Sequence, residues 1–409
     1  MADVVTEVTT KGYGRRLGSS ITSAALGFVL FIGSFVFLGW NEGNFVKVAQ
    51  GLKEARTSLV ELDDTKVNPG NDGKLVYMSG KTTTGEAPLL DPVFQVKSNA
   101  LMLERKVEMF QWKEDEKTET RERVGGTEET TTTYTYTKDW STKAIDSSEF
   151  NTPAGHENPD TLPYEQSKVF DEEARLGDFR LRESTIELIG GATTVPVTEF
   201  DTSKLPNSHI SGAHIYIGAQ PASPAVGDVR VSFSAISAGV VSVIAKQDGE
   251  KLVPYTAKSG STIELVSRGD KTPDELISAA VNKNTQLTWL YRAGGFLAMW
   301  IGLTMILGPF SMLFAFIPFL KSVTGFLLGV ATLLIAVVLS SLTIAVMWLF
   351  YRPLVAIGII VVAIGAAWLI KAFILDKKKD APVTPSVPPV QNQTQPPTPP
   401  SAPTPPSGV

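Results

Sequence analysis

The sequence of 409 residues contains no cysteine and only three histidines. Without cysteine, the chain cannot form disulfide bonds, thiolate metal sites or a cysteine nucleophile. The histidines, His156, His209 and His214, do not have the i, i+4 spacing of a helical metal pair. The chain also lacks a G-x-S-x-G motif and a phosphate-binding glycine loop. We therefore predict a protein that is not an enzyme and that binds no metal or cofactor.

Acidic residues are absent from residues 293–375, where the only basic residues are Lys321, Arg352 and Lys371. These bases separate long apolar runs, and a further uncharged run lies far upstream. A helix needs about 20 apolar residues to cross ~30 Å of hydrocarbon, and each run is long enough. The sequence predicts four transmembrane helices, at residues 21–40, 291–320, 324–350 and 353–375.

The segment at residues 41–290 lies between the first and second predicted helices, and its patterns favour strands. Apolar and polar residues alternate at residues 107–112 and 229–235, and residues 240–245 form a β-branched run. Residues 114–136 predict a hairpin around Gly125-Gly126 that projects into solvent, or alternatively a flexible loop. We predict an integral membrane protein that carries a large mainly-β (α+β) domain inserted between helices one and two.

Two helices are expected within this segment. Apolar residues recur every three or four positions over residues 44–55, which predicts a helix capped by Asn44. It would pack on the core of the domain or lie in the outer membrane interface. Thr272, Pro273 and Glu275 match the start of a helix, because Thr can cap it, Pro suits the first turn and Glu completes a capping box.

The flanking charges predict the orientation of the helices in the membrane, since short cytoplasmic flanks are rich in Lys and Arg. Arg15 and Arg16 precede helix one, and three lysines follow helix four at residues 377–379. Residues 1–20 are then a poorly ordered cytoplasmic flank, and residues 376–409 are a basic, then proline-rich, disordered cytoplasmic tail. Residues 41–290 are extracytoplasmic, and their excess of acidic residues argues against a nucleic-acid partner.

The apolar block places no ionisable group near the membrane midplane, which argues against transport. Gly325-x-x-x-Gly329 presents small residues on one helix face, as helix association in lipid requires, so we predict self-association through this face. Pro309 and Pro318 would kink helix two or end it early. A lipid-facing groove at that kink keeps a lipid-binding function open.

Several short segments occur in the order seen in the LUMA (transmembrane protein 43) family, which the chain resembles from about residue 18 to residue 375. The matching residues are Asn41, Glu42 and Gly43; Gln111 and Trp112; His156, Asn158 and Pro159; Gly227, Asp228 and Arg230; and Tyr351, Arg352 and Pro353. The resemblance implies four membrane helices with one large lumenal or periplasmic insert. It implies no catalytic residues, so the role of these positions stays open.

Animal members of this family are proteins of the endoplasmic reticulum and inner nuclear membrane that self-associate and organise membrane protein complexes, with lamin and emerin among their partners. The proline-rich tail departs from that pattern and is compatible with a bacterial member, located in the inner membrane with a periplasmic insert. Nuclear partners are therefore not carried over. The expected partners are a second copy of the chain, other membrane proteins and membrane lipids.

We predict a self-associating scaffold that organises membrane protein complexes or membrane structure. A membrane-lipid sensor or lipid-modifying enzyme is the alternative, and a channel comes third.

Overall fold

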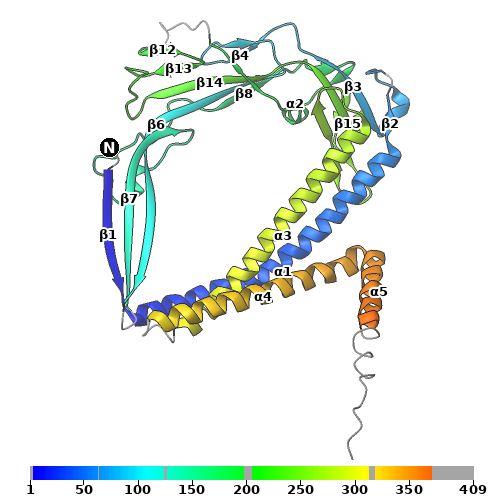
Figure 1. Cartoon of the computed structure of the whole chain (residues 1–409). Coiled ribbons are helices and arrows are strands. Elements are labelled where there is room, and N and C mark those ends of the chain that lie inside the picture. Colours follow the sequence, from blue (N-terminus) through cyan, green and yellow to red (C-terminus); the bar gives the residue numbers. More distant parts are fainter. Residues whose placement is uncertain (1–2, 63, 124–126, 198–204, 313–317, 371–409) are drawn as a thin grey trace, which may run out of the picture. The chain divides into compact units, whose positions relative to one another are not determined.

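The computed structural model describes residues 3–62, 64–123, 127–197, 205–312 and 318–370 (Figure 1). The chain divides into two compact units, residues 1–353 and residues 354–409. Two predicted features lie outside the described residues: the cytoplasmic tail at residues 376–409 and the glycine turn at residues 125–126.

Three helices in the described part of the chain are long and apolar enough to cross a membrane. They are α1 (Tyr13–Ser58), α3 (Pro273–Met312) and α4 (Pro318–Tyr351, with the candidate span from Ser322). The predicted fourth helix corresponds to α5 (Pro353–Ile370), an uncharged helix that is mostly in the second unit. Three candidate membrane helices are thus found among the described residues, and the fourth stays a prediction.

α1 is one uninterrupted helix of 46 residues, whereas the sequence predicted a span at residues 21–40 and a separate helix at residues 44–55. Asn44 lies inside this helix and does not cap a new one. The reason is that no proline separates the two segments and residues 41–55 continue the helical spacing without a break. The predicted packing of this part on the core of the domain is confirmed, because Leu52 and Ala55 are buried there.

α3 begins at the predicted capping box. The Glu275 amide donates to Thr272 Oγ1 at 3.3 Å, and the Thr272 amide donates to Glu275 Oε2 at 2.8 Å. The helix continues through Pro309 to Met312, so Pro309 does not end it. Pro318 is the first residue of α4, where a missing amide donor costs nothing. Lys321 accordingly lies inside α4, whereas the predicted boundaries placed it between helices two and three.

The domain has two main sheets, formed by strands between α1 and α3 together with β1, which precedes α1. The first has the order β1-β7-β6-β14-β13-β12, with β8 also on β6 and β11 also on β14. Its strands are β1 (Asp3–Lys11), β6 (Met102–Glu122), β7 (Glu128–Ser141), β8 (Ser167–Phe170), β11 (Thr193–Val195), β12 (Ser208–Ser211), β13 (His214–Ile217) and β14 (Val229–Ile236). The strands predicted at residues 107–112 and 229–235 are confirmed as β6 and β14, which pair antiparallel.

The second sheet has the order β19-β15-β16-β10-β9-β3-β2, and β15 also pairs with β3. Its strands are β2 (Val60–Glu61), β3 (Leu75–Thr83), β9 (Arg175–Leu176), β10 (Phe179–Arg180), β15 (Val240–Asp248), β16 (Lys251–Val253) and β19 (Leu265–Arg268). The remaining elements are small: β4 (Leu89–Leu90) with β5 (Lys97–Ser98), β17 (Tyr255–Thr256) with β18 (Thr262–Ile263), the helix α2 (Glu183–Ile189), and two 3₁₀ turns, Pro69–Asn71 and Ser147–Glu149.

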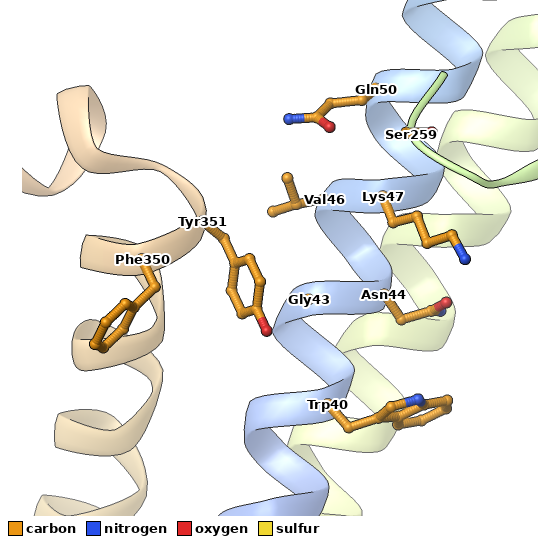
Figure 2. Close-up of a pocket in the computed structure, with 9 residues that line it drawn as sticks. All are labelled: Trp40, Gly43, Asn44, Val46, Lys47, Gln50, Ser259, Phe350 and Tyr351. Atoms are coloured by element: carbon orange, nitrogen blue, oxygen red, sulfur yellow. The ribbon is translucent and has the colours of Figure 1, made fainter. Parts of the chain in front are cut away.

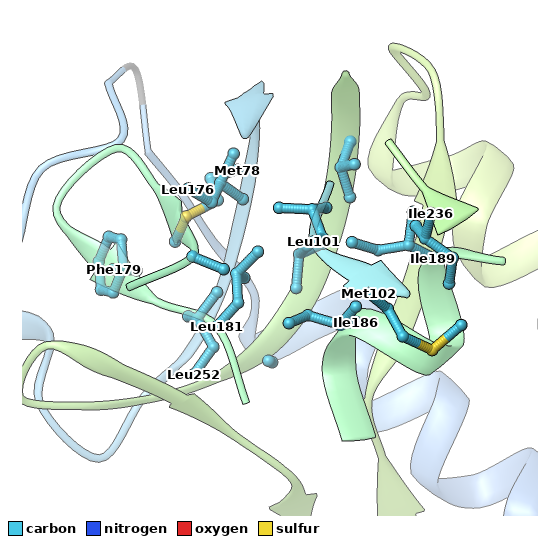
Figure 3. Packing of buried hydrophobic residues seen from close by; sticks show 14 of the residues in the cluster. Met78, Leu101, Met102, Leu176, Phe179, Leu181, Ile186, Ile189, Ile236 and Leu252 are labelled. Atoms are coloured by element: carbon cyan, nitrogen blue, oxygen red, sulfur yellow. The ribbon is translucent and has the colours of Figure 1, made fainter. Parts of the chain in front are cut away.

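The core of the domain is continuous with the helices that enter the membrane. One cluster of buried side chains, which includes Leu101, Phe179 and Ile186, lies around the second sheet (Figure 3). A second cluster joins Leu52 and Ala55 of α1 and Leu276 and Ile277 of α3 to Leu75 and Ile244 of the sheet. α1 and α3 therefore share a core with the domain.

α1 and α3 also contact closely within their apolar parts, through glycines that the sequence analysis did not single out. A Cβ atom on Gly302 would lie 2.8 Å from the Gly27 carbonyl oxygen and 2.8 Å from the Phe31 nitrogen. A Cβ atom on Gly27 would lie 2.5 Å from Met305 Cβ. Only glycine at both positions allows the backbones to approach this closely.

The hairpin predicted at residues 114–136 is confirmed as β6 and β7, but it gains a third strand. β1 pairs antiparallel with β7 along all nine of its residues, and Arg16 at the start of α1 forms an ion pair with Glu128 at 3.1 Å. In the structure, residues 3–11 form a strand and residues 13–20 begin α1, in place of the poorly ordered flank that was expected; the cytoplasmic side of residues 1–20 stays a prediction. Valine and threonine dominate residues 4–10, and these β-branched residues favour a strand when a partner edge is available.

Candidate functional site

Two of the matching segments, far apart in the sequence, meet where the apolar parts of α1 and α4 end. Asn41 and Glu42 belong to α1 and are buried, with exposures of 1% and 0%. Tyr351 is the last residue of α4 and lies beside Gly43. Because α3 packs against both helices here, the three helices α1, α3 and α4 meet at this junction. Further along α1 and α3, the same helices pack on the sheets of the domain (Figure 1).

The centre of the junction is an ion pair between Glu42 and Arg292 of α3. Arg292 donates from Nε to Oε1 at 2.6 Å and from Nη2 to Oε2 at 2.8 Å, which is the paired geometry that best suits a carboxylate. Trp348 Nε1 of α4 donates to Glu42 Oε2 at 2.9 Å. The carboxylate thus joins α1, α3 and α4 through three donors.

Aromatic rings cover the cation. The Arg292 guanidinium lies 4.7 Å from the centroid of the Trp289 ring and 5.8 Å from that of Trp348. A ring face attracts a cation more strongly when water is excluded. Because the two rings cover Arg292, the pair is shielded from solvent. Losing either partner would leave a buried charge unpaired.

Polar contacts extend the junction along α1 and α3. Asn41 donates from Nδ2 to the Thr288 carbonyl at 3.2 Å, and Asn284 donates from Nδ2 to the Phe45 carbonyl at 3.2 Å. Each amide bridges the two helices through a backbone oxygen, so the contacts fix the register of α1 against α3.

The neighbouring matching residues set the approach of α4. A Cβ atom on Gly43 would lie 2.8 Å from the Tyr351 hydroxyl oxygen, so glycine makes room for this ring. The Arg352 guanidinium lies 4.6 Å from the centroid of the Phe45 ring. Pro353 is the first residue of α5.

A second group of matching residues lies on β6 and the loop that follows β7, away from the junction. Gln111 donates to the Lys143 carbonyl at 2.9 Å and accepts from the Ile145 amide at 2.8 Å. Asn158 accepts from the Trp112 amide at 2.7 Å and donates to the Trp112 carbonyl at 3.0 Å. These two side-chain amides pair with backbone as a strand would, and they hold the loop on β6.

His156 is buried in the same group. Its Nδ1 lies 2.9 Å from the Thr152 carbonyl oxygen, and its Nε2 lies 3.4 Å from Asp3 Oδ2. The imidazole stacks on Tyr136 with 3.8 Å between centroids and meets Trp112 edge-on. The imidazole is thus held by the loop at Nδ1 and by Tyr136 and Trp112 at its ring, and its Nε2 lies beside Asp3 of β1.

Gly227, Asp228 and Arg230 form a third group around the start of β14. Gly227 has φ +93°, which suits glycine, and places Asp228 so that its carboxylate accepts from the Tyr216 hydroxyl and from the Ala225 amide. A Cβ atom on Gly227 would lie 3.5 Å from Pro159, which joins this group to the His156 loop.

Arg230 forms an ion pair with Glu108 of β6. It donates to Glu108 Oε2 at 2.7 Å and lies 4.6 Å from the centroid of the Trp140 ring. Burial alone would raise the pKa of the Glu108 carboxyl, but hydrogen bonds and charge from Arg230 and Lys106 outweigh it and hold that pKa below its usual value. The contacts of this group hold β14 to its neighbouring strands β6 and β13.

Gly325 and Gly329 lie on α4, apart from all three groups. A Cβ atom at either position would meet no atom within 4 Å among the described residues. The Gly329 carbonyl accepts from Trp300 Nε1 of α3 at 3.2 Å, and Thr332 and Ala336, which continue the same helix face, are fully buried within the chain. The structure thus leaves room at the two glycines, while the rest of that face packs internally.

The family model described as Transmembrane protein 43 matches residues 109–353. The human protein named Transmembrane protein 43 is 33% identical over 362 residues, which cover 85% of this chain and 88% of the human one. The chain belongs to the transmembrane protein 43 family. The Transmembrane protein 43 homolog of Drosophila melanogaster is 30% identical over 350 residues, covering 81% of this chain and 89% of the fly protein. No solved structure matches the chain.

The transmembrane protein 43 match at residues 109–353 includes Arg292 and Trp348, two junction residues whose contact with Glu42 the sequence analysis missed. A signal was available. Glu42 directly follows the uncharged residues 17–41, where a carboxylate requires a cation, and Arg292 holds the corresponding place at the start of the next apolar run.

Proposed function

We propose that this transmembrane protein 43 family member is a non-enzymatic scaffold that self-associates and organises membrane protein complexes or membrane structure. The observation that supports it most is the junction of Glu42, Arg292 and Trp348, which joins α1, α3 and α4, two of which also pack on the core of the domain. The Glu42 carboxylate, the His156 ring and the Asp228 carboxylate are all engaged by neighbouring residues. Such groups position elements, as a scaffold requires.

The proposed topology has α1, α3, α4 and α5 as four spans, an extracytoplasmic domain at residues 41–290 and a cytoplasmic tail. Its partners would be a second copy of the chain, other membrane proteins and membrane lipids. The uncharged sequence of α5 and the three lysines that follow residue 375 support the last span and the side of the tail.

Self-association tests the proposal directly. Gly325→Leu combined with Gly329→Leu fills the open space on α4, so we expect the purified protein in detergent to shift toward monomer in multi-angle light scattering. The domain should keep its circular dichroism spectrum, because neither glycine touches it.

Gly33→Leu on α1 is the matched control, since a Cβ atom there also meets no described atom within 4 Å. It introduces the same bulk on another apolar helix and should leave the oligomer unchanged. A double variant with the mass of the unmodified oligomer would exclude this face as the contact, and an unmodified protein that is already monomeric would contradict self-association.

A further inference from the structure

A groove lies beside the junction, between the end of α4 and the continuing part of α1 (Figure 2). Its volume is about 590 Å³, within the range of small-molecule sites. Tyr351 projects from the end of α4 toward Gly43, and Asn44, Lys47 and Gln50 follow on successive turns of α1. The complete lining is Trp40, Gly43, Asn44, Val46, Lys47, Gln50, Ser259, Phe350 and Tyr351.

The lining changes from apolar to polar along α1. Trp40 and Phe350 end the apolar parts of α1 and α4, and their side chains are 55% and 75% exposed. Lys47 and Gln50 lie about 10 to 15 Å further along the helix, given its rise of 1.5 Å per residue. Aromatic residues followed by polar ones mark the level of lipid headgroups. The groove therefore opens at the membrane surface.

The charge of the groove is positive. Lys47 is exposed and forms no ion pair with any residue that the structure describes, and none of the lining residues is acidic. Glu42, the nearest acid along α1, is buried and neutralised by Arg292. Asn44, Gln50, Ser259 and Tyr351 add neutral groups that can donate hydrogen bonds.

We propose that this groove binds the headgroup of one anionic phospholipid, with the phosphate at Lys47. The amides of Asn44 and Gln50 and the hydroxyl groups of Ser259 and Tyr351 can bond the remaining headgroup oxygens. The acyl chains then follow the exposed faces of Trp40 and Phe350 into the bilayer. A zwitterionic lipid fits less well, because the groove offers no carboxylate to its cationic group.

Native mass spectrometry of the delipidated full-length protein tests this site. We expect one dioleoyl phosphatidylglycerol to bind in preference to dioleoyl phosphatidylcholine. Lys47→Ala should weaken phosphatidylglycerol binding about fivefold, the effect of losing one lysine near an anionic headgroup. Lys53→Ala is the matched control on the same helix and should bind as the unmodified protein does. Circular dichroism checks that both variants are folded.

Several outcomes would overturn the proposal. Equal binding of the two lipids, or unchanged binding in folded Lys47→Ala, would remove the anionic site. Displacement of the lipid by millimolar inorganic phosphate would assign the groove to a free anion. A dimer that takes up no lipid would assign it to a second copy of the chain. Tyr351→Phe gives an independent measure, since it should weaken binding while leaving the charge intact.

Discussion

Glu42 is completely buried and receives three hydrogen bonds from two other helices. Glu42→Gln keeps the shape but leaves the Arg292 guanidinium without a counter-charge. We expect the free energy of unfolding to fall by about 3 to 5 kcal/mol, the usual cost of breaking a buried pair. The measurement is thermal unfolding in detergent, followed by circular dichroism.

Two further variants check this reason. Lys117→Gln breaks an exposed ion pair with Glu119 and should change stability by less than about 1 kcal/mol. Glu42→Leu with Arg292→Met removes both charges and should recover most of the loss, since apolar replacements of whole buried pairs are often neutral. A double variant as unstable as Glu42→Gln would show that the charges themselves are not what matters.

His156 separates the scaffold from a lipid-modifying enzyme. His156→Gln keeps hydrogen-bonding capacity and should lower stability by about 1 kcal/mol, as one weakened buried hydrogen bond would. If the scaffold proposal holds, the lipid composition of the membranes stays unchanged. Lipidomics of cells with the unmodified protein, with the variant or with no protein checks this. A lipid species lost equally in the last two, with the variant folded and abundant, would favour an enzyme in which this imidazole acts as acid or base.

At the scale of elements, the contact of α1 with α3 depends on two glycines. Gly302→Leu places side-chain atoms against the backbone of Gly27 and Phe31, which cannot move aside without separating the helices. We expect a loss of about 3 kcal/mol, at the upper end of overpacking costs. Gly33→Leu should have little effect, because its site is open. If the two variants unfold at the same temperature, the close contact of α1 with α3 does not contribute to stability.

The elements themselves were partly predictable. Alternation identified β6 and β14, and the capping box at Thr272 placed the start of α3, because these signals are local. The continuity of α1 was missed, since Trp40 marks the end of the apolar residues but not of the helix. β1 was missed for a different reason. An exposed strand is determined by its partner edge, β7, which lies more than 100 residues away.

For the whole molecule, a crossing α1 and the pairing of β1 with β7 exclude each other. β6 extends 13 residues beyond Met109, about 43 Å, to reach the start of α1. That part of the strand includes Lys113, Glu114, Asp115, Glu116 and Lys117, and each charge costs several kcal/mol in hydrocarbon. If α1 crosses the bilayer, the polar hairpin cannot follow it, and β1 must separate from β7.

We expect α1 to cross, because crossing removes the apolar surface of residues 21–40 from water and buries it in lipid. Thr6 and Thr133 are register partners, so Thr6→Cys with Thr133→Cys should form no disulfide in sealed membranes under mild oxidation. A disulfide formed at high yield would place β1 and the domain in one compartment and would exclude a crossing α1.

Labelling with an impermeant maleimide shows on which side of the membrane each position lies, independently of the disulfide test. In sealed spheroplasts or intact cells, Thr120→Cys and Thr202→Cys should react, whereas Thr6→Cys and Ser401→Cys should react only after lysis. Reaction of both domain positions only after lysis would reverse the orientation.

The membrane class of the whole molecule followed from its apolar runs, and the family followed from short segments in a fixed order. The junction could not be derived in the same way. Asn41, Glu42 and Gly43 gained a role only once Arg292 and Trp348, some 250 and 300 residues further on, were placed beside them. The positions of Glu42 and Arg292 at the ends of two apolar runs suggest that each needs a partner, but only the folded chain shows that they pair and that Trp348 joins them.

The unbroken α1 has a mechanical consequence. Leu52, in the core of the domain, lies about 18 Å beyond Trp40 along the helix axis, given 1.5 Å per residue. A helix adapts to a thinner or thicker bilayer by changing its tilt. A tilt of about 10° would move Leu52 sideways by roughly 3 Å, and α3 would move with it. The domain would then respond to the thickness of the membrane that holds it.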